Sequence, residues 1–231
     1  MEIHGIQKLT LLDYPEKVAC TIFTAGCNFR CPFCHNASLV THPDPENRIP
    51  EEEVLAFLKK RRGILDGVCV TGGEPLLQRD IEEFLVKVKE MGYQIKLDTN
   101  GSNVRRLRRL SEKKLVDYVA MDIKNAPDKY GKTIGIPDYD LENILQSADF
   151  LLHGDLEYEF RTTVVRQFHT RDDFAAIGRW IKGAERYYLQ EFVDSGDLIG
   201  KGISGYSRSI MEQALAIVRR NIPNARLRGV E

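Results

Sequence analysis

The sequence lacks an excess of charge of either sign and any long apolar run. Its 33 lysines and arginines nearly balance 34 aspartates and glutamates, giving a formal net charge of −1. A chain so close to neutral has no overall electrostatic footprint for nucleic acid or a membrane surface. No apolar stretch is long enough to span a bilayer. We therefore expect neither nucleic acid nor membrane as a partner, and we interpret the basic segment 104–110 as a solvated helix face.

Cysteine is scarce and unevenly distributed. There are five in 231 residues, an odd number, and three of them fall within residues 27–34. Thiols this close together do not build an extracellular disulfide framework, and the N-terminus shows no charged segment followed by an apolar one. We therefore expect a reducing cytoplasm. Cys20 and Cys69 lie inside apolar runs and are predicted to be small core residues.

Apolar, β-branched runs alternate with helical patterns, which is typical of successive βα units and a parallel sheet. Strands are expected at 18–23, 67–71, 93–98, 118–122, 159–165 and 186–192. Helices are expected at 50–60, 79–91, 104–110, 141–150, 172–182 and 209–221. Six units are fewer than the eight that close a full barrel. Without a linker or repeat, one domain over 1–231 is expected, with a core of about 16–195 and a C-terminal helix and tail at 206–231.

The three clustered thiols, Cys27, Cys31 and Cys34, follow the first predicted strand. An iron–sulfur cube normally takes four thiolates, so three would leave one iron with an open position. An open position on a bound metal is where a substrate or cofactor is held. The cluster of thiols therefore predicts chemistry at a metal.

Other interpretations of the same residues remain open at this point. Residues 31–35 match the C-x-x-C-H pattern of covalent haem attachment, although this leaves Cys27 unexplained. Cys31 and Cys34 could form a redox dithiol. The three thiolates with His35 could bind zinc, although adjacent residues rarely direct both side chains to one ion.

Unusual polar sequences stand at the ends of several predicted strands, where active sites of parallel α/β sheets collect. They are the cysteine segment, the Gly-Gly-Glu-Pro segment 72–75, the Asp-Thr-Asn-Gly segment 98–101, the Asp-Ile-Lys segment 122–124, and Gln190. Taken singly, the second and third could be turns, and the fourth could be a surface ion pair. Their common location is what one site built from loops would produce.

The spacing C-x-x-x-C-x-x-C, with the aromatic Phe33 before the last cysteine, resembles the signature of the radical S-adenosylmethionine (SAM) superfamily. Gly72, Gly73 and Glu74, one βα unit later, resemble its site for the SAM amino group. The resemblance implies an α/β fold, an incomplete parallel (β/α)6 barrel in a single domain. It also implies a [4Fe–4S] cluster on the three cysteines, with SAM chelating the fourth iron.

Further motifs resemble the glycyl-radical-enzyme activating enzymes. By that resemblance, Asp98 and Thr99 lie near the SAM carboxylate and a monovalent cation, and Asp122 and Lys124 contact its nucleoside. Arg161 is expected to face SAM or the substrate loop, with an ion pair as its simpler role. Where some relatives have a histidine against adenine, this sequence has Gln190 and Phe192, and Phe192 is the candidate for stacking.

The segments 5–8, 12–15 and 27–36 look like those of anaerobic ribonucleotide reductase activating proteins. This implies reductive SAM cleavage to a 5′-deoxyadenosyl radical, which forms a glycyl radical on a partner, with flavodoxin or ferredoxin as electron donor. One alternative is a radical SAM enzyme acting on a small molecule, like 7-carboxy-7-deazaguanine synthase. The other is a non-catalytic zinc-binding interaction module.

Overall fold

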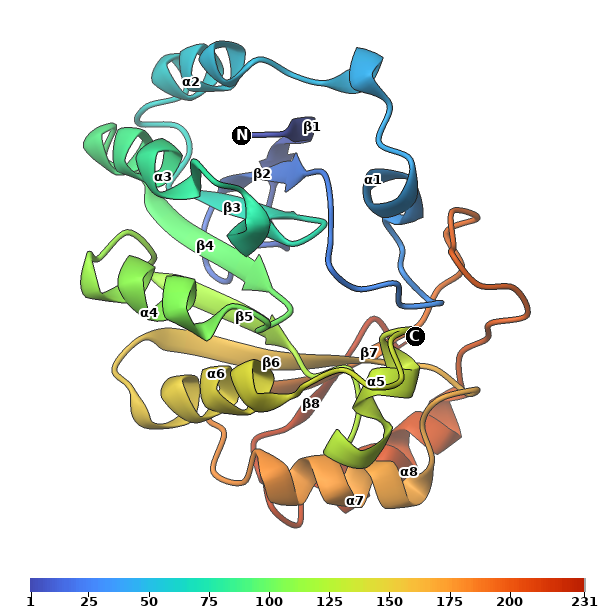
Figure 1. The fold of residues 1–231 in the computed structure, drawn as a ribbon. Coiled ribbons are helices and arrows are strands. Elements are labelled where there is room, and N and C mark those ends of the chain that lie inside the picture. Colours follow the sequence, from blue (N-terminus) through green and yellow to red (C-terminus); the bar gives the residue numbers. More distant parts are fainter. Residues whose placement is uncertain (231) are drawn as a thin grey trace. The chain divides into compact units, whose positions relative to one another are not determined.

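The structure is a computed structural model that describes residues 1–230 (Figure 1). It divides into two compact units that interleave along the chain. The first unit contains Met1–Asn28, Ser38–Thr99 and Asn103–Ala120. The second contains Phe29–Ala37, Asn100–Ser102 and Met121–Glu231. The one-domain boundaries expected from the sequence stay a prediction.

The first unit is built from four complete strands and the helices between them. The strands are β1 (Ile3–Thr10), β2 (Ala19–Thr24), β3 (Gly67–Gly72) and β4 (Gln94–Thr99). The helices are α2 (Glu51–Lys60), α3 (Ile81–Glu90) and α4 (Val104–Glu112), with short 3-10 turns η1 (Pro45–Asn47) and η2 (Pro75–Leu77). The short α1 (Ala37–Thr41) begins at the boundary between the units.

Strands β2, β3 and β4 pair in parallel and in chain order, whereas β1 pairs antiparallel with β2. β3 is buried along most of its length, and its residues Val68, Cys69 and Val70 have no exposed surface. Such continuous burial is typical of parallel strands covered on both faces. Helices α2, α3 and α4 lie along the left of Figure 1, beside β3 and β4.

The second unit contains three complete strands and their helices. The strands are β6 (Glu157–Val164), β7 (Tyr187–Glu191) and β8 (Arg226–Arg228). The helices are α5 (Tyr130–Thr133), α6 (Glu142–His153), α7 (Arg171–Trp180) and α8 (Arg208–Val218), with a 3-10 turn η3 (Pro127–Lys129). β6, β7 and β8 pair in parallel, and α7 lies beside α8 at the foot of Figure 1. β5 (Tyr118–Asp122) is divided between the units after Ala120.

The predicted alternation of strands and helices is confirmed, and all six predicted strands are present with ends shifted by at most two residues. The sequence interpretation did not include β1 or β8. Residues 3–10 carry His, Gln and Lys between apolar positions and are largely exposed from Gln7 to Leu9. β8 has only three residues, of which two are arginines.

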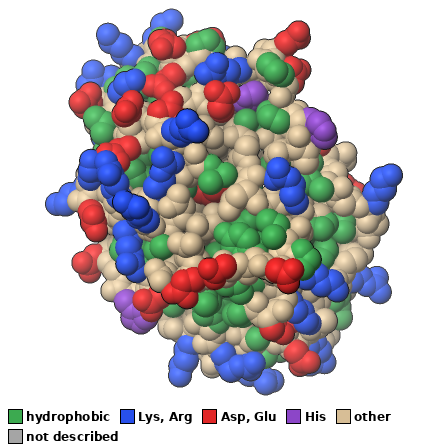
Figure 2. Space-filling view, in the orientation of Figure 1, with side chains coloured by type: hydrophobic (Ala, Val, Ile, Leu, Met, Phe, Trp, Pro, Cys, Tyr) green, Lys and Arg blue, Asp and Glu red, His purple; other side chains and the backbone are tan. Residues whose placement is uncertain are grey.

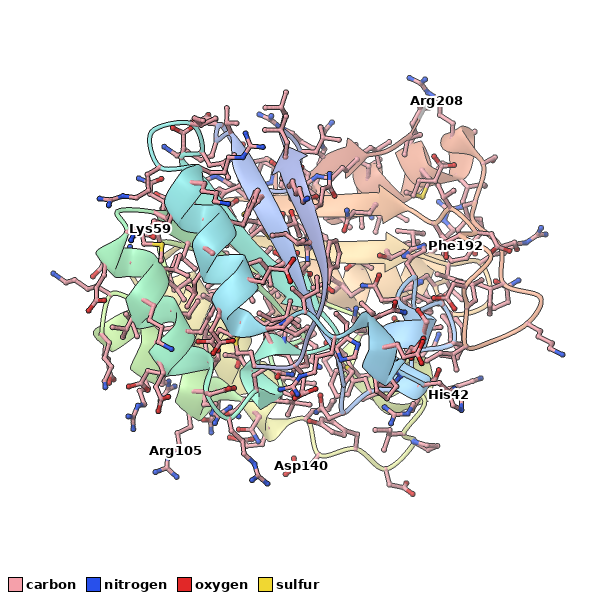
Figure 3. All side chains as sticks on the ribbon, turned by 90° about the horizontal axis from the view of Figure 1, so that it is seen from above. His42, Lys59, Arg105, Asp140, Phe192 and Arg208 are labelled. Atoms are coloured by element: carbon pink, nitrogen blue, oxygen red, sulfur yellow. The ribbon has the colours of Figure 1, made fainter. Side chains whose placement is uncertain are left out.

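Two of the sequence predictions concern the protein surface: the solvated basic face of residues 104–110 and the lack of a segment long enough to span a membrane. Val104, Leu107 and Leu110 of α4 are buried, while Arg105 points away from the ribbon (Figure 3), so the solvated basic face is confirmed. Figure 2 shows basic and acidic side chains intermingled at the left, where Figure 1 has α3 and α4. Among residues 1–230, no helix combines the length and the apolar character needed to cross a membrane.

Candidate active site

The stem of the cysteine loop (Thr24–Gly26) is hydrogen-bonded directly to the glycine turn (Gly72–Pro75) and the residues after it. Each of the three stem carbonyls accepts one bond at 2.8 Å: Thr24 from the Gly73 N–H, Gly26 from the Glu74 N–H, and Ala25 from the Gln78 side-chain amide. The Thr24 hydroxyl also donates to the Thr71 carbonyl at 3.0 Å. Because Cys27 follows this stem, the first cysteine and the glycine turn hold a fixed relation within the first unit.

Only glycine fits at the two positions where the turn approaches the stem. A Cβ on Gly73 would lie 2.0 Å from the Gly26 carbonyl oxygen, which is backbone and cannot yield as a flexible side chain could. Gly72 has φ of +113° and its Cβ would lie 2.4 Å from the Thr24 backbone. The glycine pair is therefore needed for the close approach of the stem backbone, and the approach of a ligand to these glycines stays a prediction.

Glu74, the predicted ligand of the SAM amino group, is fully buried. Its carboxylate oxygen Oε1 accepts from the Leu76 N–H at 3.0 Å and from the Thr99 hydroxyl at 2.8 Å. The structure thus brings two predicted site residues, Glu74 and Thr99, into direct contact. Binding an ammonium group at Glu74 requires that this carboxylate become accessible.

Asp98 lies beside a buried lysine. Lys96, two residues earlier on β4, forms an ion pair with Asp98, and the side chains of the two are 2% and 14% exposed. The Lys96 ammonium is also 3.9 Å from the sulfur of Cys69, which in turn is 3.8 Å from Asp98 Oδ1. Lys96 was not among the predicted site residues, although alternate residues of a strand share a face and its position relative to Asp98 was a usable signal.

In the second unit, Asp122, Lys124 and Arg161 form one ion-pair cluster. Asp122 pairs with Lys124 Nζ at 2.9 Å and with Arg161 Nε at 3.0 Å. Burial alone would raise the pKa of Asp122, but the two cations outweigh it and lower this pKa to about 2. Burial likewise opposes the charged form of Lys124, yet Asp122 raises its pKa. The predicted residues are therefore together, and Asp122 is an anion at neutral pH.

The backbone of this cluster is held from several sides. Lys124 donates its N–H to the Tyr130 hydroxyl at 3.2 Å, and its carbonyl is 2.9 Å from Nε2 of the buried His169. The Ile123 carbonyl accepts from the Thr162 hydroxyl at 2.7 Å. Such supporting bonds orient functional side chains. None of these supports was predicted, because sequence alone does not reveal which distant residues lie under a loop.

Cys31 and Cys34 lie in one turn of the second unit, in which the Cys34 N–H donates to the Cys31 carbonyl at 3.0 Å. Burial raises the pKa of the Cys34 thiol, against the effects of the Asn36 N–H and Lys124. Phe33 is buried and its ring centroid is 5.6 Å from that of Phe168.

His35 has a packing role, as the sequence interpretation with SAM implies. It stacks on Phe192 with ring centroids 5.3 Å apart, and its Nε2 is 2.8 Å from the Val193 carbonyl. Figure 3 labels Phe192 just beyond β7. The stacking of Phe192 on adenine stays a prediction.

Among the described residues, no three His, Cys, Asp or Glu side chains form a group that could hold a single metal ion. A single ion needs all its ligands around one point. A cube instead takes each thiolate on a different iron, so this finding does not bear on an iron–sulfur cluster. Cys27, in the first unit, and Cys31 and Cys34, in the second, retain the donor chemistry that a cluster requires.

Residues 21–181 match the sequence profile of the Radical SAM superfamily, so the chain belongs to that superfamily. Membership confirms the predicted class over the haem, zinc and dithiol interpretations. The family implies a [4Fe–4S] cluster and SAM, and the thiolate donors of Cys27, Cys31 and Cys34 are of the chemical type that such a cluster takes.

Two proteins similar in sequence indicate the group within the superfamily to which the chain belongs. A candidate glycyl-radical enzyme activating enzyme of Methanocaldococcus jannaschii is 33% identical over 197 residues, covering 82% of this chain and 79% of the relative. The pyruvate formate-lyase-activating enzyme of Staphylococcus aureus is 30% identical over 195 residues, covering 79% and 76%. Within the superfamily, this chain is a glycyl-radical enzyme activating enzyme, as its motifs predict.

Solved structures share the fold. Streptococcus suis SuiB bound to S-adenosylmethionine matches with a TM-score of 0.68 at 16% identity, covering 88% of this chain and 48% of that one. Coproporphyrinogen III oxidase of Escherichia coli, a radical SAM enzyme, matches with a TM-score of 0.62 at 13% identity, covering 91% and 54%. The chain thus spans about half the length of these structures. The predicted fold class, an incomplete parallel (β/α)6 barrel, is confirmed.

Proposed function

We propose that this enzyme cleaves SAM reductively at a [4Fe–4S] cluster on Cys27, Cys31 and Cys34. The resulting 5′-deoxyadenosyl radical then forms a glycyl radical on anaerobic ribonucleotide reductase. When bound, the cluster supplies the electron that breaks the carbon–sulfur bond of SAM, giving methionine and that radical. The observation that carries the proposal is the bonding of the cysteine-loop stem to the glycine turn, through the Thr24, Ala25 and Gly26 carbonyls.

Residues of both units have roles in this proposal. Gly72 and Gly73 let the turn lie against the cysteine-loop stem and so place the SAM site beside the cluster, and Glu74 receives the SAM amino group. Thr99 orients the Glu74 carboxylate through its hydroxyl, which lies 2.8 Å away. Asp122, Lys124 and Arg161 contact the nucleoside or the substrate loop, and Phe33 and Phe192 line the cofactor. The predicted monovalent cation is not part of this proposal, because the Lys96 ammonium lies at the Asp98 carboxylate.

Product analysis tests the cleavage. The protein, reconstituted anaerobically with iron and sulfide and then given dithionite and SAM, is expected to form methionine and 5′-deoxyadenosine in equal amounts. Cys31→Ala should abolish both products and reduce the bound iron. Cys20→Ala is the matched control, because Cys20 is a buried core thiol whose burial raises its pKa to about 12. Turnover retained in Cys31→Ala would contradict the proposal.

The partner is tested by paramagnetic resonance. Support for anaerobic ribonucleotide reductase comes from residues 5–15, which resemble the start of its activating proteins. We expect a glycine-centred radical signal when this reductase is added, and none with pyruvate formate-lyase. The reverse result would reassign the partner. Cleavage of SAM without a signal on either protein would favour the small-molecule alternative.

The electron donor is proposed to be a flavodoxin or a ferredoxin, since a low-potential one-electron donor must reduce the cluster. Replacing dithionite with either reduced protein should sustain 5′-deoxyadenosine formation. Failure of both, with dithionite still active, would exclude these donors.

A further inference from the structure

Lys96 is a buried cation on the strand that carries Asp98 and Thr99. It is 1% exposed as a residue, and its ammonium group is paired with Asp98. A charged lysine is almost never buried without a partner of opposite charge. Because residues two apart on a strand project from the same face, β4 directs this ammonium and the Asp98 carboxylate to one side.

The neighbouring strand contributes a thiol beside the pair. Cys69 of β3 is the register partner of Lys96, and its sulfur is 3.9 Å from the Lys96 ammonium. The same sulfur is 3.8 Å from Asp98 Oδ1. The Asp98 carboxylate and the Cys69 sulfur therefore both lie beside the ammonium, and the pair is fixed within the first unit rather than extended into solvent.

The resemblance to the activating enzymes predicts a monovalent cation at Asp98, and the residues present do not fit one. Asp98 Oδ1 already accepts a hydrogen bond from the Lys96 ammonium, so a positive charge is in place at this carboxylate. We propose that this ammonium takes the place of the cation, so that SAM binding in this enzyme needs neither Na⁺ nor K⁺. Lys96 is thus a positioning residue that the chain itself supplies.

The role follows from charge balance and rests on the proposed function. If the SAM carboxylate binds near Asp98, two carboxylates approach one another and each disfavours the charge of the other. A positive charge between them removes this repulsion. An ion from solution must be captured for that purpose, whereas Lys96 is already linked to Asp98 by two peptide bonds of the same strand.

The unmodified enzyme gives the first test. The reconstituted protein is exchanged into tetramethylammonium chloride and titrated with KCl or NaCl at constant ionic strength, while the SAM dissociation constant is measured by calorimetry. The constant is expected to change by less than about twofold over the titration. A saturable rise in affinity with either ion would overturn the proposal.

Removing the ammonium should create the dependence. Lys96→Met keeps the length of the side chain and loses its charge, so SAM affinity should fall at least about tenfold without alkali cations. KCl should restore it, because K⁺ can then occupy the vacated position. Lys89→Met is the matched control, since Lys89 pairs with Asp117 at 2.6 Å and neither residue is among the predicted site residues. A loss of affinity that KCl does not restore would contradict the replacement.

A direct measurement separates this inference from the proposed function. Thallous ion, a probe for K⁺ sites, should show no saturable binding to the unmodified protein by thallium NMR, and one site in Lys96→Met. This readout does not depend on SAM. If thallium behaves as expected but the protein does not bind SAM, the proposed function alone is contradicted. If the unmodified protein binds thallium, the inference alone is contradicted. If Lys96→Met does not fold, the two measurements on the unmodified protein decide.

Discussion

At the scale of single residues, the ion pairs of Asp122 with Lys124 and Arg161 should affect the stability of the protein in acid. Arg161 and Lys124 lower the pKa of Asp122 to about 2, below its ordinary value, despite burial. A group with a lowered folded-state pKa stabilises the fold above its unfolded pKa of about 3.9, and this contribution is lost as pH falls toward 2.

Arg161→Gln should therefore weaken the protein against acid. The substitution removes the 3.0 Å pair with Asp122, so the pKa of Asp122 should rise toward its ordinary value. Thermal unfolding of the apoprotein between pH 6 and 3 should then show its stability falling at a higher pH. Arg186→Gln is the control, because the Arg186–Glu157 pair is largely exposed. Identical acid profiles for the two variants would exclude the proposed electrostatic coupling.

Some contacts between single residues could be predicted from the sequence, and others could not. The motif residues Glu74, Thr99, Asp122 and Lys124 were predicted from motifs at strand ends that resemble those of the family, and two contacts now join them in pairs. Their supports were not predicted, since His169 reaches Lys124 from 45 residues away. Lys96 differs, because the two-residue period of a strand already linked it to Asp98.

At the scale of elements, the contact of the cysteine-loop stem with the glycine turn limits what Gly73 can become. Gly73→Ala places a Cβ 2.0 Å from the Gly26 carbonyl oxygen, which forces the two segments apart. We expect a loss of about 1–3 kcal/mol in the free energy of unfolding. Iron content and SAM affinity should fall with it. Gly5→Ala is the control, because its Cβ would lie 3.4 Å from the Phe23 side chain.

Gln78 makes the same junction through its side chain. Its amide donates to the Ala25 carbonyl at 2.8 Å, and its oxygen accepts from the Glu2 N–H at 2.9 Å. Gln78→Met removes both bonds, and loss of the buried bond to the Ala25 carbonyl should cost about 1–3 kcal/mol. Gln78→Glu retains the acceptor and loses only the donor, so it should be intermediate in stability. Equal stability of both variants and the unmodified protein, by urea unfolding, would show that the junction does not depend on Gln78.

Element boundaries were predictable where one physical signal was strong. The strand 118–122 was predicted with its exact ends, because its apolar residues, Tyr118 to Met121, lie between Asp117 and Asp122. β1 was missed because its antiparallel pairing with β2 includes register shifts and exposed polar positions. A strand whose partner, rather than its own pattern, determines its conformation cannot be found from local sequence.

At the scale of the whole molecule, the chain passes repeatedly between the two units. It crosses after Asn28, after Ala37, after Thr99, after Ser102 and after Ala120. Neither unit is a continuous stretch of sequence. The family profile, which matches residues 21–181 without interruption, likewise extends over residues of both.

This interleaving predicts a single unfolding transition. Along the chain, the segments of each unit are connected by segments of the other unit. When one unit unfolds, it releases the chain ends to which the segments of the other unit are attached, and this favours all-or-none unfolding. Trp180, the only tryptophan, packs against Tyr130 at 6.1 Å and reports on the second unit by fluorescence. Amide exchange at Val68 and Val70 of β3, paired with β2, reports on the first. In urea, with reduced apoprotein, both probes should give the same midpoint. Two separate midpoints would instead show that the units unfold independently, and the one-domain prediction would be wrong.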